Sequence, residues 1–108
     1  MTVEQLIAAA DFKALCLPEP EREIKGAYMG DLLSWVMGKA GEGSVWLTIM
    51  SNINVVAVAS LSDVACVLLT EGVTLESDVL KTAQQKGINI LSTDLPSFEA
   101  AVKIHGMV

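Results

Sequence analysis

Short apolar runs separated by polar turns form the main pattern of this sequence. Residues 65–69 are continuously apolar and are bounded by Asp63 and Gly72, and residues 88–91, apolar except for Asn89, form a similar segment after Gly87. Continuous apolar runs of this length are typical of strands buried on both faces of a parallel sheet. Strands or short extended segments are therefore predicted at residues 13–17, 24–29, 45–49, 65–69 and 88–91.

Most of the sequence between these runs has the apolar spacing and the end signals of helices. Thr2 and Gln5 have the spacing of a capping box, which predicts a helix over residues 3–10. A second helix should start at Leu32 after Gly30-Asp31, be buried over most of its surface, and end at the glycines of residues 38–43. Further helices are predicted over residues 76–86, which Gly87 terminates, and from Asp94 through residue 104, with Pro96 in the first turn.

Residues 53–59 are ambiguous. Their valines and isoleucine favour a strand by propensity. Two parallel neighbouring strands at residues 45–49 and 65–69 would instead need a crossover, and Asn52 or Asn54 could cap it as a helix. We interpret the segment as a helix. The whole pattern predicts one α/β domain over residues 1–108, with strands and helices alternating and helices on both faces of a mostly parallel sheet.

Composition narrows the classes of partner. Hydrophobic residues make up 52% of the chain and aromatic residues 5%, so the core should be aliphatic. The net charge of −6 repels phosphate backbones and anionic lipids, which argues against nucleic acid and membrane surfaces as partners. No apolar run approaches the roughly 20 residues of a membrane span, and no secretory signal is visible, so a cytoplasmic protein is expected.

Few residues suit catalysis or cofactor binding. Cys16 and Cys66 lie among apolar neighbours, so they are predicted to be buried thiols rather than a disulfide or metal ligands. His105 is the only histidine and lies near the chain end, where a helix C-terminus would favour its cationic form. The glycine-rich stretch at residues 38–44 has its lysine in the wrong place for a phosphate-binding loop. No catalytic residue, metal site or cofactor is therefore predicted, and kinase activity is not expected.

Polar residues at the strand-to-helix turns remain as candidates. In an open parallel sheet these turns share the edge at the carboxyl ends of the strands, where ligands bind. The alternative is that Asp31, Asn52 and Asp94 are only helix caps and Gly72 a turn residue. Acidic side chains there oppose a phosphate, so a neutral, cationic or metal-bridged ligand is expected. The candidate ligand-binding residues are Gly30, Asp31, Ser51, Asn52, Thr70, Glu71, Gly72, Thr93 and Asp94, with Asn54 and Ser92 beside them.

Three segments carry a resemblance to a known family. They read EIKGAYMGDLLSWVMGKAGEGSVWLTI, NINVVAVASLSDVACVLLTEG and VLKTAQQKGINILSTDLPSFEAA. In this order, over roughly residues 3–104, they resemble the DRTGG domain family, and GDLLSWVM with LSTDLPSFE is similar to its stand-alone clostridial-type branch. Ser51 and Asn52 stand where the family has Asp-Arg, and Thr70, Glu71 and Gly72 stand where it has Thr-Gly-Gly.

The resemblance implies an α/β domain that is often dimeric and that occurs alone, beside CBS domains in regulated pyrophosphatases, or within some phosphate acetyltransferases. It implies no catalysis by the domain itself. Relatives are often labelled serine kinase by similarity to the N-terminal part of HPr kinase, but this chain has no phosphate-binding loop. Stand-alone relatives resemble companions of iron hydrogenase and redox-sensing gene sets.

Three functions follow from these observations. The first is a noncatalytic regulatory or interaction module that forms a homodimer, buries exposed apolar side chains such as Trp35, Met37 or Trp46, and binds a small ligand at the turn edge. The second is an enzyme that holds Mg²⁺ between the carboxylates at the turns. The third is a structural subunit of a redox assembly, with a protein partner and no ligand of its own. We favour the first. The carboxylates of the second are Asp31, Glu71 and Asp94.

Overall fold

Strands and helices alternate along the chain, as the apolar runs predict. A computed structural model describes all residues, 1–108. The strands are β1 (Lys13–Cys16), β2 (Gly26–Met29), β3 (Ser44–Thr48), β4 (Cys66–Leu69) and β5 (Ile90–Ser92). The helices are α1 (Val3–Ala10), α2 (Leu33–Lys39), α3 (Asn54–Ser62), α4 (Ser77–Gln85) and α5 (Ser97–Ile104). All five predicted strands are present, and the segment that was ambiguous in the sequence is the helix α3.

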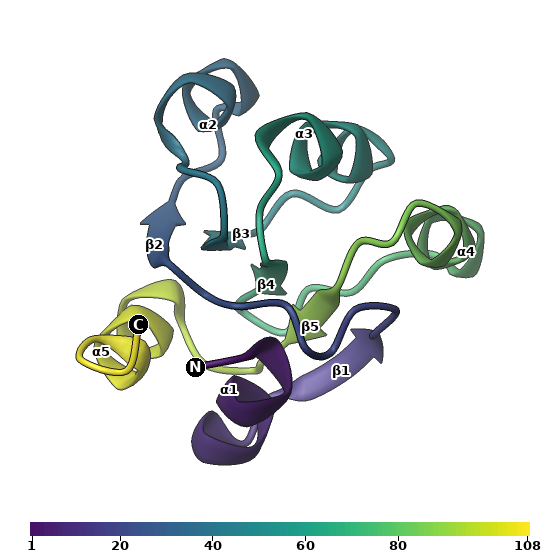
Figure 1. The fold of residues 1–108 in the computed structure, drawn as a ribbon. Helices are drawn as coiled ribbons and strands as arrows, with labels where there is room; N and C mark the ends of the chain where they lie inside the picture. The colour runs from purple at the N-terminus through teal and green to yellow at the C-terminus, as the bar shows by residue number, and fades with distance from the viewer.

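The strands form one sheet in the order β1-β5-β4-β3-β2 (Figure 1). Strands β2 to β5 are parallel, and β1 joins β5 antiparallel at one edge, with an irregular register between Ala14 and Cys16. The three inner strands β5, β4 and β3 are buried at every position. This is the burial expected for a sheet covered on both faces, and it explains why the residues of these strands are mostly apolar.

Helices cover the two faces of the sheet unequally. Helices α2, α3 and α4 lie on one face, and α1 and α5 lie on the other (Figure 1). Successive residues of a strand point to opposite faces, so neighbours in β4 belong to different cores: Val67 packs with α3 and α4, and Leu68 packs with α1 and α5. The predicted α/β architecture with helices on both faces is confirmed.

Helix α2 is much more exposed than the sequence predicted. Only Val36 is fully buried, whereas the side chains of Leu32, Trp35 and Met37 are each more than half exposed. The reason is its position. Helix α2 follows the edge strand β2, so α3 is the helix that it mainly packs on, and no helix covers its other side. Trp46, which the sequence analysis grouped with the exposed residues, is fully buried in β3.

Helix caps were predicted correctly only at the first helix. Thr2 and Gln5 form the complete capping box of α1. Asp31 and Asp94 cap nothing, because α2 starts after Leu32 and α5 starts after Pro96, both without a side-chain cap. At α3 the side chain of Asn52 accepts the backbone N–H of Asn54 at 2.9 Å, although the residue at the cap position is Ile53.

None of the helices is both long and apolar enough to cross a lipid bilayer. Cys16 and Cys66 are both buried free thiols, as predicted. Gly87 ends α4 with a φ of 73°, a conformation that glycine adopts without strain, so this predicted helix end is also confirmed.

Candidate functional site

The strand-to-helix turns lie along one edge of the sheet. Because β5, β4, β3 and β2 are neighbours and parallel, the turns that follow them stand in that order at the carboxyl ends of the strands. The nine predicted residues therefore share one edge. Hydrogen bonds divide them into two groups, one around Glu71 and one around Asp31, with Ser51 and Asn52 exposed between them.

Glu71 links the turn after β4 to the start of α5. Its Oε2 accepts the backbone N–H of Ser97 at 2.9 Å, and the hydroxyls of Thr70 and Ser97 are 2.6 Å apart. The backbone adds two bonds, from the N–H of Glu71 to the carbonyl of Leu95 and from the N–H of Gly72 to the carbonyl of Thr93. A carboxylate at a helix N-terminus is favourable to the helix dipole, so Glu71 takes the capping role that the sequence assigned to Asp94.

The backbone at Glu71 and Gly72 forms a tight turn. Their φ values are 61° and 73°, and the N–H of Val73 bonds to the carbonyl of Thr70 at 3.1 Å. Two central residues with positive φ and this bond define a type I′ turn. Gly72 fits this conformation, but Glu71 does so at a cost of about 1 kcal/mol, since its Cβ crowds the backbone. The contacts of the Glu71 carboxylate offset that strain.

Replacing Glu71 by alanine is expected to lower the free energy of unfolding by about 1 kcal/mol, because the N–H of Ser97 loses its acceptor and the backbone strain remains. Urea denaturation measures this change. Glu71→Gln is the matched control: it keeps an oxygen acceptor and should lose less than half as much. No loss of stability in Glu71→Ala would show that the carboxylate does not act as a cap.

Asp31 anchors the other end of the edge. Its Oδ1 accepts the hydroxyl of Thr48 at 2.7 Å and the backbone N–H of Ile49 at 3.0 Å, so it ties the turn after β2 to the end of β3. Gly30 is held in the same place, because its carbonyl accepts the indole N–H of Trp46 at 2.9 Å. These residues were predicted as ligand-binding or capping, and in this structure their polar atoms hold the backbone.

A polar hollow lies at the β5 end of the edge. It has a volume of about 370 Å³, and only one of its eight lining residues is hydrophobic. Ser92, Thr93 and Asp94 contribute the turn after β5, and two lysines from distant segments join them. The lining residues are Asp11, Lys13, Ser92, Thr93, Asp94, Leu95, Pro96 and Lys103.

The two lysines were missed in the sequence because they lie far from the turn. Lys13 opens the antiparallel strand β1, where it pairs with Ser92, and Lys103 lies in the last turn of α5. Neither forms an ion pair, although Asp11 and Asp94 line the same hollow. No Lys or Arg stands in the turns themselves, but these two lysines from β1 and α5 line the hollow at the β5 end.

The three carboxylates of the metal hypothesis are not gathered. Glu71 is bound to the start of α5, and Asp31 is bound to the end of β3. No three His, Cys, Asp or Glu side chains lie together in a way that could hold one metal ion. The arrangement at the β5 end suits a small polar ligand that carries charge, because two lysines, two aspartates and two hydroxyl-bearing residues are among the lining residues.

Comparisons with known proteins relate this chain to one protein family and to one solved structure. Residues 36–107, most of the chain, match the family described as "DRTGG domain". The fold is similar to the crystal structure of the CBS and DRTGG domains of the regulatory region of Clostridium perfringens pyrophosphatase complexed with an activator, diadenosine tetraphosphate. The TM-score is 0.74 and the identity 16%, over 95% of this chain and 45% of that chain. This chain therefore spans less than half the length of that one. No curated protein matches the sequence.

Proposed function

The chain belongs to the DRTGG domain family, and we propose that it is a noncatalytic regulatory module that forms a homodimer and binds a small anionic ligand in the hollow beside β5. The observation that carries the ligand half is the pair of lysines. The chain has seven basic residues against thirteen acidic ones, and two of the seven lie in this one polar hollow without an ion pair.

The two lysines favour an anion bearing a phosphate or carboxylate group, although Asp11 and Asp94 balance their charge in the hollow as a whole. Lys13 and Lys103 supply two ammonium groups, and Ser92 and Thr93 supply hydroxyls. Asp94 would repel an anion, but it can bind the polar or cationic part of the same ligand. The similar pyrophosphatase region is complexed with diadenosine tetraphosphate, an activator that carries phosphates, which supports testing nucleotides first.

The proposal that the module is noncatalytic rests on the residues that line the hollow, which include no histidine and no thiol. Neither His105 nor either thiol lines the hollow, and the hydrogen bond of Thr93 Oγ1 is one that it accepts, from the backbone N–H of Leu95 at 3.2 Å. The hollow suits binding, and Glu71 holds the backbone of the neighbouring turn after β4. A ligand held here would contact β1, β5 and α5 together.

Thermal denaturation with diadenosine tetraphosphate, ATP, inorganic phosphate and acetyl phosphate tests the ligand. A probe present at about 100 times its Kd should add about 2.7 kcal/mol of stability, and the melting temperature should rise accordingly. Replacing both Lys13 and Lys103 by methionine should weaken binding at least about tenfold, since hydrogen bonds to charged groups contribute about 1.5–3 kcal/mol each.

Lys81→Met is the matched control, because Lys81 is exposed on α4 and does not line the hollow. Its binding should equal that of the wild type. A shift that survives in the double lysine variant would place the site elsewhere. No shift with any of the four probes would contradict the proposed ligand class.

A further inference from the structure

The two edges of the sheet differ in how they are protected. Strand β1 has an irregular register between Ala14 and Cys16 and is followed by Pro18 and Pro20. Irregular registers, prolines and charged side chains are the usual means by which an edge strand avoids pairing with another chain. Strand β2, Gly26–Met29, has none of these: its four residues are Gly, Ala, Tyr and Met, and they pair with β3 in a regular register.

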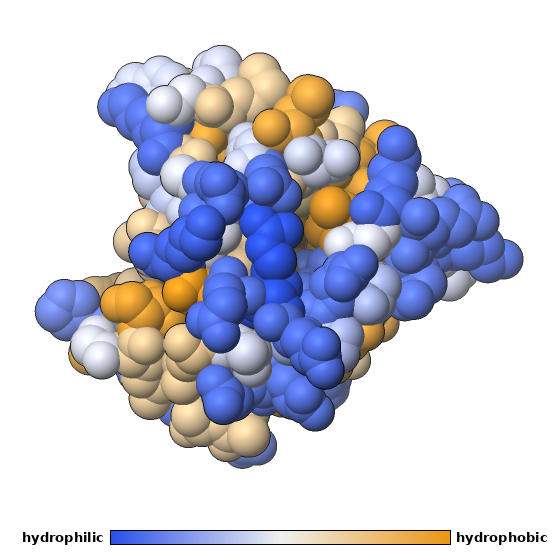
Figure 2. Space-filling model, viewed as in Figure 1, coloured by the Kyte–Doolittle hydropathy of each residue, from blue (hydrophilic) through white to orange (hydrophobic).

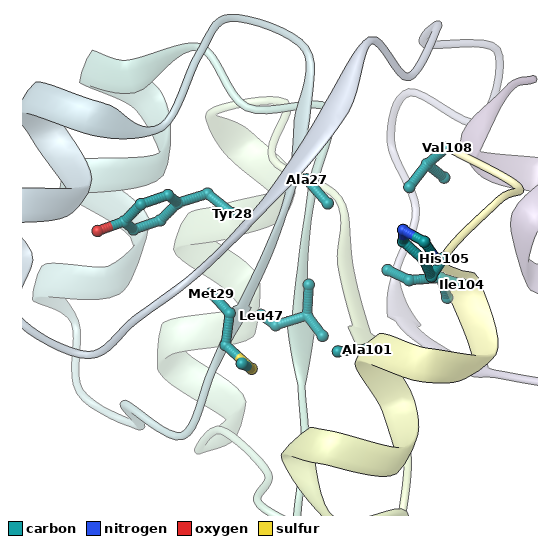
Figure 3. Close-up of a pocket in the computed structure, with 8 residues that line it drawn as sticks. All are labelled: Ala27, Tyr28, Met29, Leu47, Ala101, Ile104, His105 and Val108. Carbon is teal, nitrogen blue, oxygen red and sulfur yellow. The ribbon is translucent and has the colours of Figure 1, made fainter.

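An apolar groove runs beside this unprotected edge. Its volume is about 330 Å³, and seven of its eight lining residues are hydrophobic. Figure 3 shows Ala27 and Met29 of β2 on the side of the strand that faces α5, whereas Tyr28 points away from α5. In Figure 2 apolar side chains gather at the same place, between β2 and α5. The lining residues are Ala27, Tyr28, Met29, Leu47, Ala101, Ile104, His105 and Val108.

The apolar surface continues beyond the groove. The side chain of Met29 is 52% exposed, and on α5 the side chains of Phe98 and Val102 are 66% and 60% exposed. Because α5 stands away from the edge strand, no helix of the chain covers this side of β2. A strand edge with free N–H and C=O groups beside an uncovered apolar groove is suited to strand addition.

We propose that β2 of a second copy of this chain pairs antiparallel with β2, so that the two sheets join into one across a two-fold axis. The proposal rests on the proposed homodimer and gives it an interface. A two-fold axis perpendicular to the sheet keeps every side chain on its own face, so one residue of β2 must lie on the axis opposite its own copy. The candidates are Ala27, Tyr28 and Met29.

Complementarity selects Tyr28 as the residue on the axis. In that register Met29 lies opposite Ala27 of the other copy, so the largest exposed side chain of the strand meets the smallest on the groove side, and it can enter the groove. Lys25 then lies opposite Asp31, a pair of opposite charge outside the ends of β2. In this pair Asp31 Oδ1 stays bound to Thr48 and Ile49, and Oδ2 faces the ammonium group. Lys25 and Asp31 are both exposed. Lys25 already contacts Glu42 at 2.6 Å, but that ion pair is exposed, so Lys25 can exchange it for Asp31 at little cost.

The other two registers are less favourable. With Met29 on the axis, Ala27 would lie opposite Asp31, so no pair of opposite charge forms and a carboxylate is placed beside the apolar groove. With Ala27 on the axis, Met29 would lie opposite Lys25, which places an ammonium group at the apolar groove. Only the Tyr28 register combines opposite charges with a large side chain facing a small one.

A cysteine at the axis tests this register directly. In antiparallel strands two directly opposed residues have Cα atoms about 4.5–5.5 Å apart, within the range that a disulfide bridges. Tyr28→Cys should therefore form a covalent dimer on mild oxidation. Ala27→Cys is the matched control: its two copies would be about 8 Å apart, beyond the reach of a disulfide. The native thiols do not compete, because both are buried.

Sedimentation velocity at micromolar concentration gives the second readout. The wild type should be a dimer, and Met29→Glu should raise the dimer Kd at least about 100-fold, since it places two uncompensated carboxylates in apolar surroundings. Leu61→Glu is the control, because Leu61 is 77% exposed on α3, away from the groove, and this variant should stay dimeric.

The outcomes separate the interface from the homodimer itself. A wild-type dimer without a Tyr28→Cys cross-link, or with Met29→Glu still dimeric, would overturn the β2 interface and leave the homodimer in place. A cross-link at Ala27→Cys and not at Tyr28→Cys would overturn the register. A wild-type monomer would overturn the homodimer and the interface together.

Discussion

Replacing Trp46 by alanine is expected to lower the free energy of unfolding by about 3–5 kcal/mol, because the whole side chain is buried and its loss leaves a cavity. A domain of this size has a total stability of about 5–15 kcal/mol, so much of the stability would be lost. The melting temperature should fall by roughly 15–30 °C. Urea denaturation and differential scanning calorimetry measure both quantities.

Two controls separate packing from hydrogen bonding. Trp46→Phe keeps most of the ring but removes the indole N–H that binds the carbonyl of Gly30 at 2.9 Å, so it should cost about 1–3 kcal/mol. Trp35→Ala makes the same truncation at a side chain that is 56% exposed. It loses the contact with Lys39, whose Nζ lies 4.1 Å from the ring centre, and the packing of the buried part of the ring, so its cost should be well below that of Trp46→Ala. Equal losses in Trp46→Ala and Trp35→Ala would contradict the burial of Trp46.

The sequence predicted the order of strands and helices well because burial dominates it. Strands β3 and β4 are buried on both faces, so apolar side chains occupy every position of β4 and the three central positions of β3, and the strand pattern is clear. Helix α3 follows from connectivity: two parallel neighbours need a crossover, and this outweighed the strand propensity of its valines. The surroundings of Trp46 and Trp35 differ only because β3 is central and α2 lies at an edge, which no local pattern reveals.

The turn residues were harder to assign because their partners are distant in sequence. Cap preferences are local. Asp31, however, accepts hydrogen bonds from Thr48 and Ile49, and the first backbone N–H of α5 donates to Glu71, 26 residues away. The resemblance that places Glu71 where the family has a glycine also has a structural reason, since its φ of 61° is one that glycine adopts without strain. Sequence reasoning located the edge, but it could not say which polar atoms are already engaged there.

The residues of the polar hollow were also only partly predictable from the sequence. Its turn residues Thr93 and Asp94 were predicted, but Lys13 and Lys103 come from the first strand and the last helix. They meet because β1 pairs antiparallel with β5 while α5 packs on the same side of the sheet as α1. An antiparallel edge strand cannot be recognised from alternating strands and helices, since that alternation predicts only parallel neighbours. Whether these residues bind a ligand stays a prediction.

Cys66 is expected to make the stability of the protein fall steeply in alkaline solution. The thiol is fully buried in β4, and this burial raises its pKa from 9.0 to about 12. In the unfolded chain the thiol loses its proton near its ordinary pKa, so between about pH 9 and pH 12 the unfolded state binds fewer protons than the native state. Stability from this group is complete below pH 9 and is lost as the pH rises toward 12, by up to about 1.4 kcal/mol per pH unit.

Urea denaturation of the wild type and of Cys66→Ala, at about pH 8 and about pH 10.5, isolates this contribution. The alanine variant loses a small side chain, so at the lower pH it should be less stable than the wild type. It has no thiol to ionise, so the difference should shrink by about 2 kcal/mol at the higher pH, because the other groups titrate alike in both proteins. The difference in stability between the wild type and Cys16→Ala should also shrink at the higher pH, because burial raises the pKa of the Cys16 thiol too. A difference between the wild type and Cys66→Ala that stays constant with pH would mean that the Cys66 thiolate is tolerated inside the sheet, and that water reaches β4 in the native protein.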